Sequence, residues 1–295
     1  MFAFEGFDYQ GFIMRPPSEA HSILIQFTLG CSHNKCSFCN AYKDKRFALK
    51  PREILERDIA FASKYCRSQD RLFLMDGDAL IAPQASWEWM LDQIRTRLPW
   101  VRRVGVYANS KSVKLKSDGD LRRLREMGLG IAYYGVESGD DETLKNIRKG
   151  AGADRLIEQG KRLKKAGIKL SITVLLGIAG QARSLEHARA TGELLTAIDP
   201  EYVGALTVMV MPDTPLQADL DSGAFRLPAP QEALAELREM VSHTSLSNGL
   251  FMSNHASNYL PVKIQYPQGK AEGLRLLDSA VAGATHLRSE WMRRL

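Results

Sequence analysis

Three of the four cysteines in this 295-residue chain fall within nine residues, at Cys31, Cys36 and Cys39. They directly follow an apolar run over residues 23–30, and the fourth, Cys66, lies well apart from them. Three thiolates close together on one loop can bind a metal, but they leave one iron of a four-iron cluster without a protein ligand. The spacing therefore predicts a metal centre with one iron open to an outside ligand.

Two other interpretations of these cysteines stay open at this point. With His33 they could form a structural zinc site, although zinc ligands usually come as two separated pairs and these four would be crowded. They could also be unrelated thiols, which in so tight and exposed a group would be prone to oxidation. A zinc site, or a cluster that only carries electrons, would make the protein a non-catalytic metal-binding module.

The elements that must position these cysteines repeat regularly along the chain. Short apolar runs alternate with amphipathic helical patterns, which is typical of βα units and a parallel sheet. Strands are expected at 22–29, 71–76, 103–108, 130–136, 168–176 and 201–209. Helices are expected near 51–65, 84–97, 117–127, 154–166 and 184–197, and a further one near 230–242. Six such units predict an α/β fold, a partial (βα)6 barrel of the TIM type.

Local signals mark the ends of two of these helices. Ser117 and Asp120 form a capping-box pattern before the third helix, which Gly128 is expected to end. Ser184 is expected to cap the fifth. Active sites of βα barrels lie at the carboxyl ends of the strands. The cysteine loop satisfies this rule, whereas Cys66 follows the first helix and is expected to be a core or rim thiol.

The loop from Gly30 to Cys39 resembles the cluster loop of radical S-adenosylmethionine (SAM) enzymes. Their usual spacing is C-x3-C-x-aromatic-C; here four residues separate Cys31 from Cys36, while Cys36, Phe38 and Cys39 fit. The resemblance implies that the three cysteines hold a 4Fe-4S cluster whose open iron binds SAM. An electron from the cluster would cleave SAM to methionine and a 5'-deoxyadenosyl radical, which abstracts hydrogen from a substrate.

The segments that follow the other predicted strands are similar to those of the coproporphyrinogen-dehydrogenase-like branch of this family. Residues 75–79 stand where the family has a Gly-Gly-Glu motif that receives the SAM amino group, although Asp-Gly is also an ordinary turn. After the fourth strand the resemblance implies an acid, Glu137, and twelve positions on a cation, Lys149, with Arg148 as the alternative. An acid suits the sulfonium and ribose, and a cation suits the methionine carboxylate. The alternative is a surface ion pair.

The resemblance implies a full set of cofactor contacts around these strand ends. Asn109 suits either the SAM ribose or the substrate, and Arg183 suits either an anion or solvent. The cofactor-binding residues expected in this way are Phe38, Asp76, Gly77, Asp78, Asn109, Glu137, Ser138, Lys149, Thr173, Gly177 and Arg183.

The remainder of the chain offers two candidate catalytic residues. The stretch 253–263 is rich in amide, hydroxyl and imidazole groups, which could form a hydrogen-bonded loop. The other interpretation is a wall facing the substrate, with His255 or Tyr259 near the radical. We expect an N-terminal segment over 1–21, the barrel over 22–216 and a C-terminal extension over 217–295 that covers the barrel opening.

Composition narrows the possible partners. The chain is 44% hydrophobic and 25% charged, as in ordinary globular proteins, and contains no run long enough to span a membrane. The N-terminus lacks the pattern of a signal peptide, and cysteines are few, so a cytoplasmic location is expected.

The net charge of +6 comes mainly from residues 95–126 and 145–170. These segments lack interleaved aromatics, so we interpret them as solvated helix faces and expect no nucleic-acid partner. A small-molecule substrate, with an anionic one left open, and an electron donor such as flavodoxin or ferredoxin are expected. No cysteines remain for an auxiliary cluster, and position 41 is Ala where coproporphyrinogen dehydrogenases have a fourth Cys, so a porphyrin substrate is not implied.

Overall fold

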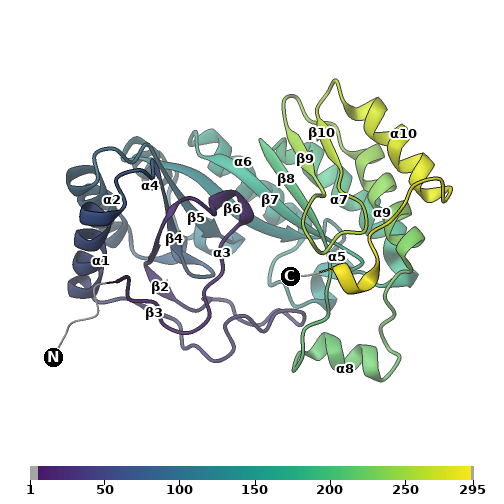
Figure 1. Ribbon diagram of the computed structural model, residues 1–295, viewed down its shortest axis with the longest axis horizontal. Coiled ribbons are helices and arrows are strands. Elements are labelled where there is room, and N and C mark those ends of the chain that lie inside the picture. Colours follow the sequence, from purple (N-terminus) through teal and green to yellow (C-terminus); the bar gives the residue numbers. More distant parts are fainter. Residues whose placement is uncertain (1–5, 294–295) are drawn as a thin grey trace. The chain divides into compact units, whose positions relative to one another are not determined.

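The computed structural model describes residues 6–293 (Figure 1). It divides into two compact units. Unit 1 comprises Met1–Asn34, Ala41–Tyr134 and Arg162–Lys169, and unit 2 comprises Lys35–Asn40, Gly135–Lys161 and Leu170–Leu295. Within residues 6–293, no helix has both the length and the apolar composition that crossing a membrane requires.

The sheet of unit 1 is built from parallel strands in chain order. β1 (Ile23–Gln26) pairs with β4 (Arg71–Met75), β4 pairs with β5 (Arg103–Ala108), and β5 pairs with β6 (Leu129–Glu137). A short antiparallel pair, β2 (Thr28–Leu29) and β3 (Ala48–Leu49), follows β1. The strand expected at 22–29 is therefore two strands on either side of Phe27, because β1 pairs with β4 whereas Thr28 and Leu29 pair with β3.

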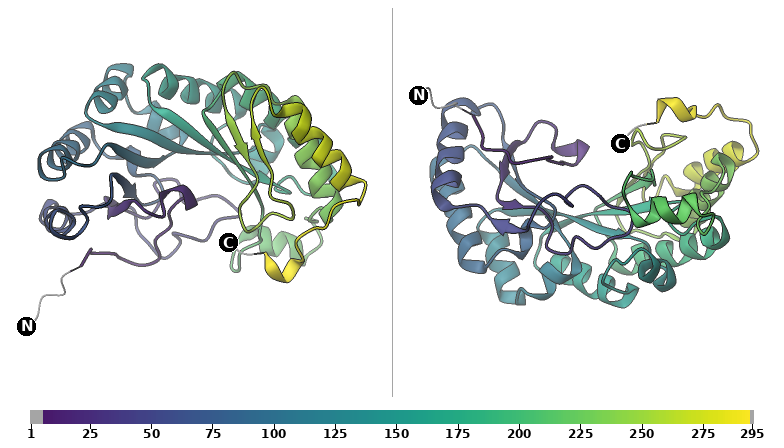
Figure 2. Two further views of the ribbon diagram at one scale, coloured as in Figure 1. Left: turned by 45° about the horizontal axis from the view of Figure 1, so that its top comes forward. Right: turned by 90° about the horizontal axis from the view of Figure 1, so that it is seen from below.

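Three helices cover one face of this sheet (Figure 2). They are α1 (Arg52–Tyr65), α2 (Gln84–Arg97) and α4 (Asp118–Glu126), which bury Leu55, Trp87 and Leu121 toward the strands. The Ser117–Asp120 capping box of α4 is present, as predicted. The shorter elements of unit 1 are η1 (Pro17–Glu19), η2 (Ala79–Ile81) and α3 (Ser110–Lys114).

The N-terminal segment packs on the opposite face of the unit 1 sheet. Glu19 is fully buried there and accepts hydrogen bonds from Arg103 and Tyr133. The rings of Tyr107 and Tyr133 contact Phe73 edge to face at 5.0 and 5.5 Å. The segment around η1 is thus an integral part of this unit's core.

The sheet of unit 2 continues the parallel pattern and then reverses. β7 (Lys169–Leu176) pairs with β8 (Tyr202–Thr207) and β8 with β9 (Leu250–Met252) in parallel, whereas β10 (Lys263–Gln265) is antiparallel to β9. The C-terminal part of the chain therefore adds two strands beyond β8. The other elements are α5 (Asp141–Asn146), α6 (Ala153–Lys165), η3 (Gln181–Arg183), α7 (Ser184–Ile198), α8 (Pro215–Asp221), α9 (Pro230–His243), α10 (Lys270–Val281) and η4 (Glu290–Met292).

Helices α7 and α9 lie side by side in unit 2 (Figure 1). Gly192 makes this close approach possible, because an added Cβ there would lie 2.7 Å from the Met240 carbonyl oxygen. Ser184 was expected to cap α7, but it is the first helical residue and Arg183 holds the N-cap position. The prediction is wrong because the Ser184 hydroxyl donates to Glu236 of α9 instead.

The α/β class with successive parallel βα units is confirmed. β1, β4, β5, β6, β7 and β8 stand close to the six predicted strands, and α1, α2, α4, α6, α7 and α9 close to the predicted helices. The short helices α3, α5 and α8, the later α10, and the strands β9 and β10 were not expected from the sequence.

Candidate active site

Gly77 is the point where the end of β4 meets the start of the cysteine loop. A Cβ added at Gly77 would lie 3.0 Å from the Cβ of Cys31 and 2.5 Å from the ring of Tyr42. The Gly77 N–H donates to the Gly30 carbonyl at 3.1 Å. Only glycine therefore allows Cys31 to sit this close to the β4 end.

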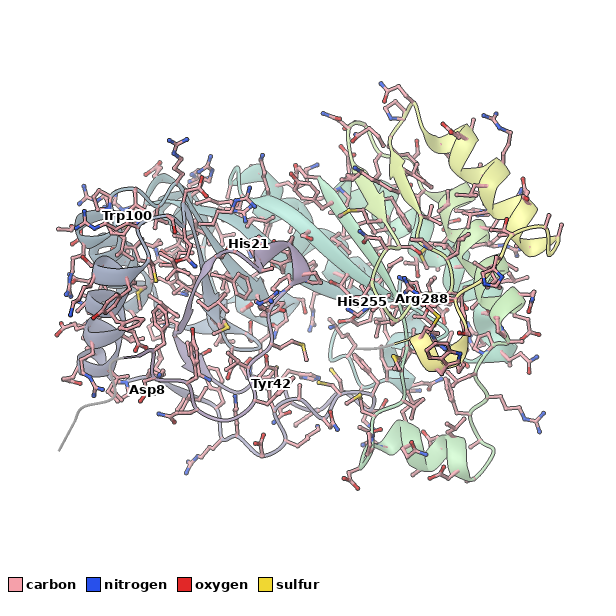
Figure 3. All side chains as sticks on the ribbon, in the orientation of Figure 1. Asp8, His21, Tyr42, Trp100, His255 and Arg288 are labelled. Atoms are coloured by element: carbon pink, nitrogen blue, oxygen red, sulfur yellow. The ribbon has the colours of Figure 1, made fainter. Side chains whose placement is uncertain are left out.

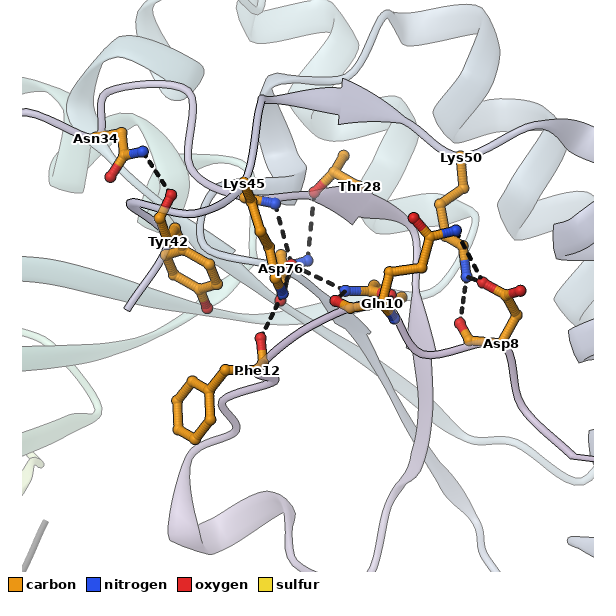
Figure 4. Close-up of polar contacts among 11 residues, drawn as sticks. Asp8, Gln10, Phe12, Thr28, Asn34, Tyr42, Lys45, Lys50 and Asp76 are labelled. Atoms are coloured by element: carbon orange, nitrogen blue, oxygen red, sulfur yellow. Dashed lines mark hydrogen bonds and ion pairs between the residues drawn. The ribbon is translucent and has the colours of Figure 1, made fainter. Parts of the chain in front are cut away.

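Asp76 joins three segments of unit 1 through one carboxylate oxygen (Figure 4). Its Oδ2 accepts hydrogen bonds from Gln26 Nε2, the Gly30 N–H and Lys45 Nζ, each at 3.0 Å. Its Oδ1 is buried and has no hydrogen-bond partner within the described part of the chain. Asp76 thus fixes the start of the cysteine loop while one of its oxygens stays unpaired.

Asp78 has a similar half-paired carboxylate. Its Oδ2 accepts a hydrogen bond from Ser32 at 2.5 Å, and its Oδ1 has no partner in the region that the structure describes. Burial raises the pKa of the Asp78 carboxyl to about 7. Nearby Asn109 caps α3 by accepting from the Ser112 N–H at 2.9 Å. Because buried carboxylate oxygens are normally paired, the two unpaired oxygens after β4 fit an N–H donor such as an amino group.

Residues 8–12, here called the N-terminal strap, are bonded to the side chains of Gln26, Lys45 and Lys50 (Figure 4). Lys50 Nζ forms an ion pair with Asp8 at 2.6 Å. Gln26 Nε2 donates to the Gln10 carbonyl at 3.1 Å, and Lys45 Nζ donates to the Phe12 carbonyl. Gln26 and Lys45 therefore bridge the strap to Asp76.

The Lys45–Asp76 ion pair, with side-chain exposures of 8% and 0%, should matter for stability. Lys45→Met is expected to cost about 3–5 kcal/mol, because removal of one partner leaves a buried charge uncompensated. For a chain of this size, the thermal unfolding midpoint should fall by roughly 6 °C or more.

The control for this prediction is Arg95→Met, which breaks an exposed pair with Asp92 and should cost less than about 1 kcal/mol. Adding Asp76→Asn to Lys45→Met should recover much of the loss, because no buried charge then remains. Equal unfolding midpoints for Lys45→Met and Arg95→Met would contradict this account of the pair.

The second half of the cysteine loop lies in unit 2. Between Cys36 and Cys39, the Ser37 N–H donates to the Ile147 carbonyl and the Ser37 carbonyl accepts from the Leu216 N–H, both at 3.0 Å. Cys36, Phe38 and Cys39 are half-buried. The loop is therefore held by its backbone on both sides, while its thiols keep partial exposure.

Cys66 differs from the loop cysteines. It ends α1, it is buried, and its carbonyl accepts from Trp100 Nε1 at 3.2 Å. Burial raises the pKa of its thiol, which disfavours the thiolate that metal ligation needs. This is the position expected of a core thiol.

Glu137 and Lys149 pair with each other in unit 2. Lys149 Nζ lies 2.9 Å from Glu137 Oε1, with side-chain exposures of 11% and 10%. Glu137 has φ +67°, in the left-handed region that non-glycine residues rarely adopt. A Cβ added at Gly135 would lie 2.5 Å from Glu137 Oε1 and 3.1 Å from Lys149 Nζ. The pair is thus largely buried rather than an exposed surface pair.

The family model described as "Radical SAM superfamily" matches residues 25–189, more than half of the 295-residue chain. The protein belongs to the radical SAM superfamily. It is therefore an enzyme that uses a 4Fe-4S cluster and SAM, and the zinc and non-catalytic interpretations are set aside. In such a cluster the three protein ligands bind three different irons. No curated protein sequence matches the chain.

Several solved structures share the fold at low sequence identity. Coproporphyrinogen III oxidase (HemN) from Escherichia coli has a TM-score of 0.57 at 15% identity, over 75% of this chain and 51% of that one. The methyltransferase TsrM from Kitasatospora setae has a TM-score of 0.54 at 15% identity, over 81% of this chain and 54% of that one. Methylornithine synthase (PylB) has a TM-score of 0.51 at 17% identity, over 76% of this chain and 63% of that one. The chain thus spans less than two thirds of each. The partial (βα)6 barrel of TIM type is confirmed.

The expected site residues in and after β7 have their contacts within unit 2 of this radical SAM enzyme. Thr173 is half-buried in the strand, and Gly177 has φ +79° and donates its N–H to Glu236 Oε1 at 2.6 Å. Arg183 forms ion pairs with Asp140 at 2.8 Å and with Glu142 at 2.9 Å. Arg183 therefore connects η3 to the loop after β6. These two protein partners favour neither of the roles expected for Arg183, contact with an anion or free solvation.

Most polar groups of the 253–263 stretch hydrogen-bond within unit 2. His255 Nδ1 accepts from the Ser257 N–H at 3.1 Å, and burial lowers the pKa of the ring. Arg288 lies beside His255 and donates to its carbonyl (Figure 3). The Tyr259 hydroxyl accepts from Arg293 at 2.6 Å. These contacts favour the hydrogen-bonded loop, and a catalytic role for His255 or Tyr259 stays a hypothesis.

Several residues around the site were missed by sequence reasoning. Gln26, Ser32 and Lys45 hold Asp76 and Asp78, yet nothing in their local pattern marks them. A signal did exist for Glu236, because it interrupts the apolar face of a predicted helix between Ala233, Leu237 and Met240.

Proposed function

We propose that this radical SAM enzyme cleaves SAM reductively and abstracts a hydrogen atom from a small-molecule substrate. The observation that carries the proposal is a three-cysteine loop that meets, at Gly77, a strand end with two unpaired buried carboxylate oxygens. When bound, the cluster and SAM supply the one-electron chemistry, in which an electron splits SAM into methionine and a 5'-deoxyadenosyl radical.

The chain's own task in this proposal begins with the ligands. Cys31, Cys36 and Cys39 bind three irons as thiolates and leave the fourth open. The backbone bonds of Gly30 and Ser37 hold the loop on either side of its central turn. Phe38, half-buried between two of these cysteines in the sequence, would shield a bound cluster from bulk water.

We assign the residues after β4 to the SAM amino group. The N–H groups of this amino group, whose nitrogen lone pair would go to the open iron, would donate to Asp76 Oδ1 and Asp78 Oδ1, which are both buried and unpaired in the described residues. A hydrogen bond to a charged carboxylate is stronger than one between neutral groups, especially away from water.

We assign the remaining SAM groups to the ends of β5, β6 and β7. Lys149 suits the methionine carboxylate and Glu137 suits the ribose and sulfonium, because each presents a formal charge from a mostly buried position. The other proposed contacts are Asn109, Ser138, Thr173 and Gly177. The ion pairs of Arg183 support a role in fixing the loop after β6 rather than direct contact.

Gly135→Ala tests whether the geometry of this pair matters. The new Cβ would displace the flexible ends of Glu137 and Lys149 and would meet no backbone atom nearby. SAM affinity is expected to fall about tenfold, the equivalent of about 1.4 kcal/mol. The control Gly119→Ala, whose Cβ would lie 3.6 Å from Ser117 Oγ, should leave it unchanged. If Gly135→Ala binds SAM as tightly as wild type, the Glu137–Lys149 pair is not part of the SAM site.

The partners in this proposal are a small-molecule substrate and a one-electron donor such as flavodoxin or ferredoxin. A reducing cytoplasm suits a partly exposed cluster loop. His255 and Tyr259 remain the candidates for substrate contact, and a porphyrin is not implied.

Incubation of anaerobically reconstituted protein with SAM and dithionite tests the proposed function. Chromatography should detect 5'-deoxyadenosine and methionine in equal amounts, and only when reductant is present. Protein that holds four irons and binds SAM but releases no deoxyadenosine would refute the reductive cleavage.

A further inference from the structure

Glu236 of α9 is a fully buried acid that the proposed reaction does not use. Its Oε1 accepts the Gly177 N–H at 2.6 Å, and its Oε2 accepts the Ser184 hydroxyl. Burial raises the pKa of this carboxyl to about 7, which reflects the cost of its desolvation. An apolar side chain would fill the same space without that cost, so the carboxylate has a use other than packing.

A buried histidine continues from Glu236 toward the end of β6. His187 Nε2 lies 3.4 Å from Glu236 Oε1, and His187 Nδ1 lies 2.7 Å from Ser138 Oγ. Burial lowers the pKa of His187 to about 4, so the ring is neutral at pH 7. Ser138 Oγ accepts the Asp140 N–H at 3.0 Å, which leaves its own proton for Nδ1. The ring proton is then on Nε2, which contacts Glu236 Oε1 at 3.4 Å but makes no hydrogen bond within the described residues.

The two ends of this chain of contacts are the two loops that we assign to SAM in unit 2. Ser138 directly follows Glu137 at the end of β6, and Gly177 directly follows β7. Glu236 contacts the second loop itself and reaches the first through His187. One side chain from the C-terminal part of the chain thus hydrogen-bonds the second loop and packs against the histidine that hydrogen-bonds the first.

We propose that Glu236 is a positioning residue that sets the conformation of the loops after β6 and β7 for SAM binding. This inference rests on the proposed function. Glu236 does not touch the cofactor; it acts through the Gly177 backbone and, through His187, on Ser138. The C-terminal extension thereby contributes to cofactor affinity as well as to the core.

The test compares two replacements of Glu236 in the cluster-loaded protein, by calorimetric titration with SAM. Glu236→Met keeps the length but accepts no hydrogen bond, and should weaken SAM binding about tenfold or more. Glu236→Gln keeps an oxygen for the Gly177 N–H and should stay within about threefold of wild type. Iron content should be unchanged in both. Glu239→Met is the matched control, since this acid of α9 pairs with Arg189 at 2.6 Å and should leave SAM affinity unaltered.

Hydrogen–deuterium exchange without SAM supplies a second readout. Residues 175–180 should exchange faster in Glu236→Met and at the wild-type rate in Glu236→Gln. If Glu236→Met does not fold, His187→Leu replaces it and should weaken SAM binding at least threefold.

Three outcomes overturn the proposal. If folded Glu236→Met, or His187→Leu in its place, binds SAM as tightly as wild type, the positioning role alone is wrong. If Glu236→Gln is as weak as Glu236→Met, the accepted hydrogen bond is not the cause. If wild-type protein with a full cluster binds no SAM, the proposed function fails as well.

Discussion

Replacing Cys31, Cys36 or Cys39 with Ala is expected to abolish cluster binding. In our proposal each supplies one of only three protein ligands, and two thiolates on a loop do not hold a four-iron cluster. Wild-type protein purified without oxygen should be brown with about four irons per chain, and each variant should hold less than about one. Iron and sulfide analysis measures this directly.

Cys66→Ala is the control for these variants, because it removes a thiol of the same kind from elsewhere in the chain. Cys66 is buried at the end of α1, so its replacement should leave the iron content unchanged. Loss of iron in Cys66→Ala, together with retention in any loop variant, would show that the ligands are wrongly assigned.

Glu137→Ala and Lys149→Ala are expected to weaken SAM binding while the cluster stays in place. Each removes a charged contact worth about 1.5–3 kcal/mol, which corresponds to roughly a ten- to hundredfold loss of affinity. Each also leaves the other member of a largely buried pair without its counter-charge. SAM titration of cluster-loaded protein measures the affinity, and iron analysis verifies that the cluster remains.

Arg238→Ala and Asp278→Ala provide the matched control. This pair has a similar contact distance, 2.8 Å against 2.9 Å for Glu137 and Lys149, but its side chains are exposed at 38% and 55%. Neither control variant should change SAM affinity. Unchanged titrations in both Glu137→Ala and Lys149→Ala would remove these two residues from the SAM site.

The parallel βα pattern could be predicted because each unit carries its own signal. Apolar runs buried on both faces and amphipathic helices of ten or more residues are visible locally. The short helices α3, α5 and α8 were missed because five to seven residues show too little periodicity. β9 and β10 were missed because three-residue strands depend on the sheet they join.

The spacing of the cysteines led to the proposed ligands, but the network behind them could not be predicted. Lys45 and Gln26 reach Asp76 from residues 31 and 50 positions away along the chain. Such contacts are set by how strands and loops pack in unit 1, which no local pattern encodes. Ser184 illustrates the same limit, because a buried acid on a distant helix overrides its capping preference.

The C-terminal stretch 253–263 shows how composition alone leaves a choice open. Its polar groups suit either a loop or a site wall, and only their partners separate the two. Asn258 bonds to Thr207 and to the Ala205 carbonyl of β8, which anchors the loop at the carboxyl end of that strand. The sequence showed the polar groups but not that most of them are satisfied within unit 2.

The electron paramagnetic resonance spectrum of the reduced cluster, recorded with and without SAM, tests the open iron most directly. An iron without a protein ligand can bind the amino and carboxylate groups of SAM, which changes the electronic environment of the cluster. The signal should therefore change on SAM addition and saturate at the affinity that titration gives. A reduced four-iron cluster whose spectrum does not change at saturating SAM would contradict the assignment of an open iron that binds SAM.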